Sequence, residues 1–184
     1  DTGEVILLTE GGDYEFASRN MPWIKDLRVW PYSTREASDV VSRLLAEKNI
    51  SEGLVGYDDV TSPAVIMSLA DHFPSIKFVD GTDTMARARL IKDPEEIKVI
   101  EFAAQIAEIG MQAARECLKP GVQESAVAAE MARAMLAAGA DALVTHPQVT
   151  TDALRRMATD KRIRHGDVVL VDINVGYNGY LGDF

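Results

Sequence analysis

The sequence has little cysteine, no long hydrophobic run and fewer basic than acidic residues. Its single cysteine, Cys117, excludes an intrachain disulfide framework and fits a reducing compartment. There is no run of about 18 apolar residues and no charged-then-apolar leader, so we expect a soluble, cytoplasmic protein with no membrane partner. Because 19 Lys and Arg face 29 Asp and Glu, the formal net charge is −10, which argues against a nucleic-acid partner.

The 184 residues are 47% apolar, which is enough for a real core in one large or two small domains. The first ~80 residues alternate between strand-like and helix-like patterns, which is typical of a small α/β domain. The predicted strands are Val5–Thr9, Leu27–Trp30 and Leu54–Tyr57, and the predicted helices are Ser33–Lys48 and Ser62–His72.

A connector, residues 81–94, is expected to separate this domain from a long helix. Asp93 is suited to the N-cap position and Pro94 to the first helical position. The helix should run through Cys117, a core thiol on its apolar stripe, and stop at Lys119-Pro-Gly121. A second helix is predicted over Glu124–Ala138, ended by Gly139.

Two aspartates, Asp172 and Asp183, flank an Asn-Gly pair in the stretch DINVGYNGYLGD. Asn-Gly between apolar residues predicts a two-residue hairpin turn, because a type I′ turn needs positive φ at both central residues. Such a turn places Asp183 opposite Asn174. Asp172 lies two residues from Asn174 on the same face, so the Cα atoms of Asp172 and Asp183 should be roughly 7–8 Å apart. A three-residue loop would put the aspartates on opposite faces.

The run from Asp167 to Ile173 is apolar enough to predict a buried central strand. Two carboxylates facing each other there require either a proton on one of them or a cation between them. The residues alone leave a second reading open, an exposed hairpin whose aspartates are solvated.

Several landmarks occur in a characteristic order. They are Arg89-Leu-Ile-Lys-Asp-Pro-Glu-Glu-Ile97 and its helix, Lys119-Pro-Gly-Val-Gln-Glu124, Gly139-Ala140, Asp160-Lys-Arg-Ile163, Gly166-Asp167, and Asp172 through Asp183. Together they resemble the pita-bread metallohydrolases: methionine aminopeptidase, aminopeptidase P, prolidase and the non-peptidase creatinase. The resemblance is strongest to the Xaa-Pro peptidase branch.

The resemblance implies an α/β (α+β) fold in two parts. Residues 1–84 would form the small N-terminal α/β domain of the creatinase and prolidase branches, and residues 85–184 the first half of the pita-bread catalytic domain. Both ends of the chain look cut. The remaining family ligands, one His and two Glu, would lie beyond Phe184, so the chain by itself is expected to be incomplete and inactive.

In the family, the aspartates at the positions of Asp172 and Asp183 bind metal. Asp183 would contact both of two divalent ions, and Asp172 mainly one. Oxygen-rich ligands favour Mn²⁺, Co²⁺ or Zn²⁺, and such a pair can activate water against the bond before proline. A peptide or small-molecule substrate and a homodimer are the further expectations from the family.

The sequence departs from the family at the residue that usually contacts substrate. Arg155 stands at the usual histidine position, and His146 is the candidate that could replace it. His165 and His72 are predicted to be ordinary surface residues, and Asn174 stands where the family often has glycine. Two alternatives to an Xaa-Pro peptidase stay open: a creatinase-like enzyme acting on a small metabolite, and a noncatalytic module.

Overall fold

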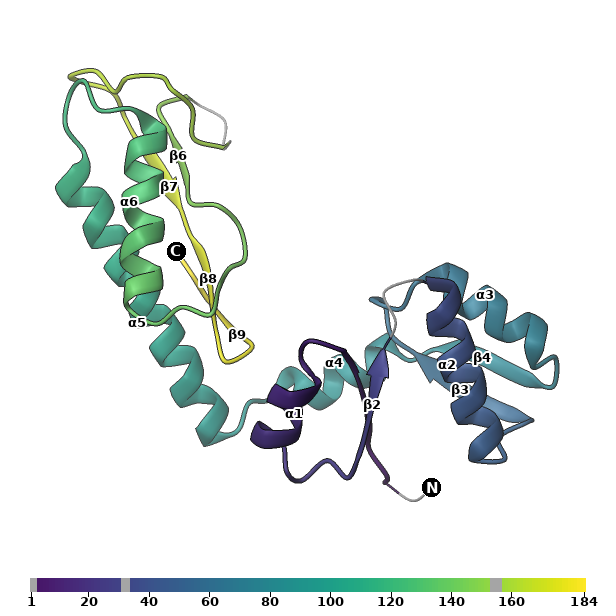
Figure 1. The fold of residues 1–184 in the computed structure, drawn as a ribbon. Coiled ribbons are helices and arrows are strands. Elements are labelled where there is room, and N and C mark those ends of the chain that lie inside the picture. The colour runs from purple at the N-terminus through teal and green to yellow at the C-terminus, as the bar shows by residue number, and fades with distance from the viewer. Residues whose placement is uncertain (1–2, 31–33, 153–156) are drawn as a thin grey trace. The chain divides into compact units, whose positions relative to one another are not determined.

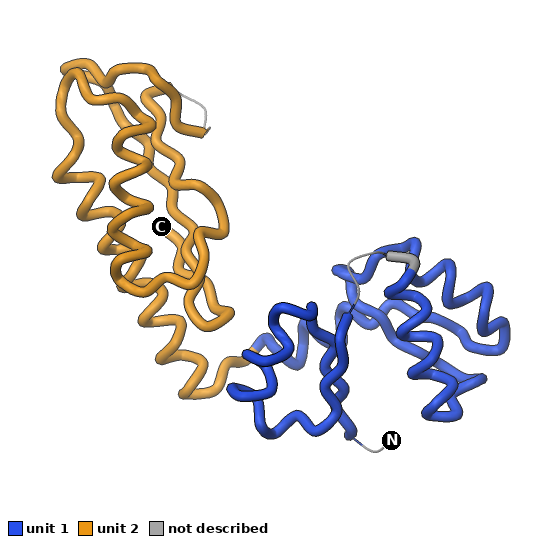
Figure 2. The backbone as a smooth tube through the Cα atoms, in the orientation of Figure 1, with its two compact units in different colours: residues 1–90 blue, residues 91–184 orange. Residues whose placement is uncertain are grey.

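The chain folds into two compact units, which Figure 2 draws in different colours. The structure is a computed structural model that describes residues 3–30, 34–152 and 157–184. The units are residues 1–90 and 91–184, whereas the predicted boundary after residue 84 falls inside a helix, α4 (Thr82–Leu90). None of the helices in these described ranges has the length and apolar content needed to cross a membrane.

The first unit alternates strands and helices along its whole length (Figure 1). The predicted strands and helices are confirmed, to within one residue at each described end. In order, the elements are β1 (Ile6–Glu10), α1 (Tyr14–Asn20), β2 (Asp26–Trp30), α2 (Thr34–Glu47), β3 (Gly53–Tyr57), α3 (Pro63–His72), β4 (Ile76–Asp80) and α4. The described strands form two parallel pairs, β1 with β2 and β3 with β4, and α2 packs on α3.

The helix α4 replaces most of the predicted connector, residues 81–94. It buries no residue, so the apolar periodicity by which helices are recognised is missing from it. Local polar contacts are found at its start. The Thr82 N–H donates to the Asp80 carboxylate over 2.9 Å, and Asp83 pairs with Arg87 one turn later at 2.9 Å. From the pattern of apolar residues alone, this helix therefore could not be distinguished from a polar linker.

The second unit consists of two helices packed on short antiparallel strands (Figure 1). Its elements are α5 (Pro94–Cys117), α6 (Glu124–Ala137), β5 (Ala142–Leu143), β6 (Gln148–Thr150), β7 (Leu170–Asp172), β8 (Asn174–Tyr177) and β9 (Tyr180–Asp183). The strands are ordered β5-β8-β9 in one sheet, and β6 pairs with β7. The core between helices and strands includes Ile106, Met131, Met135, Val149, Ile173 and Val175, with the half-buried Cys117 thiol against it.

The start of α5 confirms the predicted cap. The Asp93 carboxylate accepts from the N–H groups of Glu95 and Glu96 over 2.8 and 2.9 Å, and the Glu96 carboxylate accepts from the Asp93 N–H over 2.8 Å. This reciprocal capping box satisfies backbone donors that the first helical turn leaves without partners. The other Glu96 oxygen accepts from the Tyr180 hydroxyl over 2.5 Å, so one side chain joins the helix start to β9.

A glycine lets α5 approach β9 very closely. Gly182 is buried, and a Cβ added to it would lie 2.4 Å from the Ala103 carbonyl oxygen and 2.8 Å from the Ala104 nitrogen. Both atoms belong to the backbone of α5, so no side chain could rotate away to make room. The position therefore requires glycine for space, and Asp183 is the next residue of β9.

We predict that Gly182→Ala forces α5 away from β9 and lowers the free energy of unfolding by about 3 kcal/mol. Urea unfolding followed by circular dichroism measures the change. The matched control is Gly176→Ala on the paired strand, where an added Cβ would meet nothing closer than 3.7 Å. It should be neutral, or stabilising by up to about 1 kcal/mol. Equal effects of the two substitutions would show that the close approach at Gly182 does not matter.

Candidate metal centre

The hairpin between β8 and β9 has the predicted two-residue turn. Asn178 and Gly179 have φ of 48° and 79°, and Tyr177 pairs with Tyr180. These are the left-handed conformations that a type I′ turn needs at both central residues. The Asn178 N–H also donates to the Asp141 carboxylate at the start of β5, so the turn is fastened to the neighbouring strand.

The register that follows from this turn confirms the predicted pairing of Asn174 with Asp183. Ile173 and Phe184 exchange both backbone hydrogen bonds, at 3.0 and 3.1 Å. Pair types alternate in an antiparallel ladder, so Asn174 and Asp183 form a pair without mutual backbone bonds. In pairs of that type the side chains approach more closely, which brings the Asp183 carboxylate beside the Asn174 amide.

Burial shows which face of the strands carries the aspartates. Ile173 and Val175 are fully buried in the core that α5 and α6 cover. Side chains alternate along a strand, so Asp172 and Asn174 belong to the face that points away from the helices. Asp183 shares that face because it lies opposite Asn174. The prediction that one face carries both aspartates therefore agrees with the register and the core.

The two carboxylates differ in environment. Asp172 is only 7% exposed, whereas Asp183 is exposed. The Asn174 side-chain N–H donates to Asp172 Oδ1 over 3.1 Å, so a neutral amide stands next to the buried carboxylate. Their oxygens are the hard ligands that divalent cations accept.

The strand that leads to Asp172 is shorter and more exposed than predicted. Only Leu170–Asp172 forms the strand β7, and Val168 is 85% and Leu170 38% exposed. The prediction of a buried central strand from Asp167 to Ile173 was therefore wrong for its first half. Among the described residues β7 pairs with β6 on one side, where Gln148 lies opposite Asp172. Apolar composition alone cannot reveal that the outward face of this run is uncovered.

The donor set fits part of a cation site. In the parts of the chain that the structure describes, no three His, Cys, Asp or Glu side chains gather closely enough to hold a metal ion. The face carries the carboxylates of Asp172 and Asp183 and the amide of Asn174 beside them. These oxygen donors suit a divalent cation, and a complete site would need further ligands.

Two histidines, His146 and His165, belong to the same unit as this face, and His72 belongs to the first unit. His146 is exposed and lines a cavity of about 310 Å³ with Ser125, Ala128 and Ala132 of α6, and it does not cluster with the two aspartates. His165 is exposed, as predicted. His72 is exposed too, and its Nδ1 lies 2.7 Å from the Ser68 carbonyl oxygen. Arg155, at the usual histidine position of the family, lies outside the described residues.

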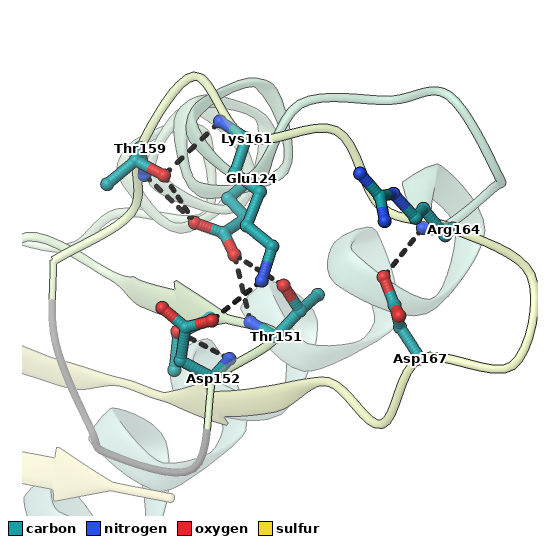
Figure 3. A network of polar contacts seen from close by, with 8 residues as sticks. Glu124, Thr151, Asp152, Thr159, Lys161, Arg164 and Asp167 are labelled. Carbon is teal, nitrogen blue, oxygen red and sulfur yellow. Dashed lines mark hydrogen bonds and ion pairs between the residues drawn. The ribbon is translucent and has the colours of Figure 1, made fainter.

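Sequence reasoning missed a buried polar network around Glu124, the first residue of α6 (Figure 3). Glu124 is fully buried, and its carboxylate accepts from the backbone N–H and the hydroxyl of both Thr151 and Thr159 over 2.7–3.2 Å. Burial by itself raises the pKa of the Glu124 carboxyl, but these four donors outweigh it and hold the pKa below the ordinary value of 4.5.

The network joins two points of the segment that connects β6 to β7. Thr151 directly follows β6, Thr159 lies near the middle of the segment, and Asp152 pairs with Lys161 at 2.6 Å beside them. The carbonyls of Lys161 and Thr159 also accept from the N–H groups of Glu124 and Ser125, the first donors of α6. Glu124 therefore holds Thr151, the residue that follows β6, and Gln148 of the same strand lies opposite Asp172. Its only sequence signal was a glutamate at a helix start with threonines about thirty residues downstream.

One cavity is lined by residues of the first unit. It measures about 920 Å³ and lies at the carboxyl ends of β3 and β4, between apolar side chains such as Val55, Leu69 and Phe78. Two aspartates line it, and both already accept from threonines: Asp58 from Thr61, and Asp80 from Thr82. Both carboxylates are thus engaged within the unit.

Comparison with known proteins agrees with this architecture. Residues 98–184 match Peptidase_M24, metallopeptidase family M24. The uncharacterized peptidase YqhT of Bacillus subtilis is 36% identical over 58% of this chain and 31% of its own length. The Xaa-Pro dipeptidase of Pyrococcus furiosus is 31% identical over 70% of this chain and 38% of its own, and the creatinase of a Bacillus species 27% over 76% and 37%.

A solved structure extends the likeness to the whole fold. The prolidase from Pyrococcus furiosus superposes with a TM-score of 0.78 and 26% identity, covering 100% of this chain and 55% of that one. Residues 98–184 are thus similar to metallopeptidase family M24, and the chain as a whole is similar to pita-bread metallopeptidases. The likeness includes relatives named as Xaa-Pro dipeptidase and prolidase. It spans between 31% and 38% of the length of the three curated relatives above.

We predict that Glu124→Gln destabilises the second unit by about 2–3 kcal/mol, because the amide nitrogen replaces an acceptor among four donors. The pKa of Glu124 is lowered on folding, so its contribution is present above pH 4.5 and is lost as the pH falls through the lower, folded-state pKa. The difference in stability between wild type and variant should therefore shrink on acidification. Urea unfolding at several pH values measures it.

The control for this variant is Glu130→Gln on the same helix. Glu130 pairs with Arg133 at the surface, so its loss should leave the free energy of unfolding at neutral pH nearly unchanged. A Glu124→Gln variant as stable as this control would contradict the anchoring role of Glu124.

Proposed function

We propose that the protein is a metal-dependent hydrolase that cleaves the peptide bond before proline, with Asp172 and Asp183 as two of its metal ligands. The observation that carries the proposal is the hairpin register. It gives two aspartates to the one strand face that the helices leave uncovered, in a chain whose residues 98–184 are similar to metallopeptidase family M24. Relatives named as Xaa-Pro dipeptidases support the choice of substrate.

The residues of the chain would act by holding and orienting. The exposed Asp183 and the buried Asp172, held by Asn174, would together hold divalent metal. When bound, such ions lower the pKa of a water molecule and polarise the scissile carbonyl. Glu124 would hold the residue that follows β6, the strand that pairs with the strand of Asp172, through its bonds to Thr151 and Thr159. His146 remains a candidate catalytic residue.

A second candidate is a creatinase-like enzyme that acts on a small metabolite. The 27% identity with a creatinase over 76% of this chain favours it, as does the arginine at position 155. Mn²⁺, Co²⁺ or Zn²⁺ as the ion, a homodimer and a cytoplasmic location stay predictions. A noncatalytic module is the third reading, and it would hold no stoichiometric cation.

We predict that Asp183→Ala abolishes stoichiometric Mn²⁺ uptake by the whole protein while the first unit stays folded. Elemental analysis after dialysis measures the metal, and circular dichroism the fold. The control is Asp167→Ala, which removes an exposed carboxylate of the same region that accepts from the Arg164 N–H. It should keep the full metal content. Retained uptake by the Asp183 variant would refute the ligand assignment.

The substrate class is tested separately by incubating the whole protein with Mn²⁺ and Xaa-Pro dipeptides. We expect cleavage before proline, detected as the release of free proline, and none with Asp183→Ala. A protein that holds the metal and leaves every Xaa-Pro dipeptide intact would favour the creatinase-like alternative.

A further inference from the structure

A neutral amide residue, Asn174, lies between the two aspartates. Asn174 lies two residues from Asp172 on the same strand face and directly opposite Asp183. Its side-chain nitrogen donates to Asp172 Oδ1 over 3.1 Å, and Asp172 is 7% exposed. A carboxamide therefore occupies the place where two carboxylates approach each other.

The pairing geometry makes this position a close one. Asn174 and Asp183 form the pair without mutual backbone bonds, so their Cα atoms are expected about 4.5 Å apart and their side chains in reach of each other. A neutral donor next to a buried carboxylate restrains the rotation of that carboxylate. A glycine at position 174 would remove this restraint on Asp172, and an aspartate would add a third negative charge.

We propose that Asn174 is a positioning residue of the metal centre: its amide fixes the Asp172 carboxylate for the cation, and its neutrality limits the negative charge of the site. The inference rests on the proposed metal site and adds to it a residue that belongs to this chain. Asn174 acts through Asp172, because its bond to that carboxylate is the contact that the structure defines.

Two substitutions of Asn174 test the two parts of this role, the restraint of Asp172 and the neutral charge. Asn174→Gly removes the donor, so the affinity for Mn²⁺ should fall by about tenfold, the usual effect of losing a residue that orients a ligand. Asn174→Asp replaces the donor by a carboxylate facing Asp172 and Asp183. Without metal it should melt at a lower temperature than wild type because like charges repel, and Mn²⁺ should raise its melting temperature by more than it raises that of wild type.

The experiment is an isothermal titration of the whole protein with Mn²⁺, together with thermal melts with and without the ion. The matched control is Asn178→Gly, the same chemical change in the same hairpin. Asn178 has φ of 48°, which glycine adopts freely, and it lies in the turn. This variant should bind Mn²⁺ as wild type does, and circular dichroism should show all variants folded.

The outcomes separate the two proposals. If Asp183→Ala loses Mn²⁺ while Asn174→Gly keeps wild-type affinity, the metal site stands and the role of Asn174 is refuted. If both variants bind as wild type does, the metal site itself is refuted, and the role of Asn174 with it. If Mn²⁺ raises the melting temperature of Asn174→Asp no more than that of wild type, Asn174 does not limit the negative charge of the site. This test holds even if Asn174→Gly fails to fold.

Discussion

The backbone conformation of two turn residues determines the whole candidate site. Asn178 and Gly179 both adopt positive φ, and only a tight turn of this kind brings Asp183 opposite Asn174. Strand side chains alternate between faces, so one extra turn residue would have turned Asp183 toward the helices. The chemistry available to the outward face thus depends on local backbone preferences in the turn, several residues away from either carboxylate.

The helices stabilise this arrangement from the other face. Ile173 and Val175 are buried against the helical core, and Gly182 rests on the backbone of α5 at Ala103. Each of these residues is a direct neighbour of a polar residue on the outward face. Packing on the helix side therefore limits how far the aspartates can move, so the site has a rigid support even though Asp183 itself is exposed.

Features with short-range causes could be predicted from the sequence. The N-cap at Asp93, the end of α6 near Gly139 and the turn at Asn178 each depend on a few consecutive residues with known conformational preferences. The helix α4 could not be predicted from apolar periodicity because it buries nothing. The Glu124 network was missed for a different reason, since its donors lie 27 and 35 residues away and only the folded chain brings them to the carboxylate.

The identity of the candidate site was predictable only in part. The shared face of Asp172 and Asp183 follows from counting residues, whereas the exposure of Val168 and the bond from Asn174 to Asp172 depend on which strands lie beside them. The contact at Gly182 has a consequence for how this region can evolve. Its partner atoms are the carbonyl and amide of α5, which every residue type carries, so no exchange of a side chain on that helix can make room for a larger residue. Sequence drift in α5 therefore cannot compensate a change at this position, and the two segments must change together through a shift of the backbone or not at all.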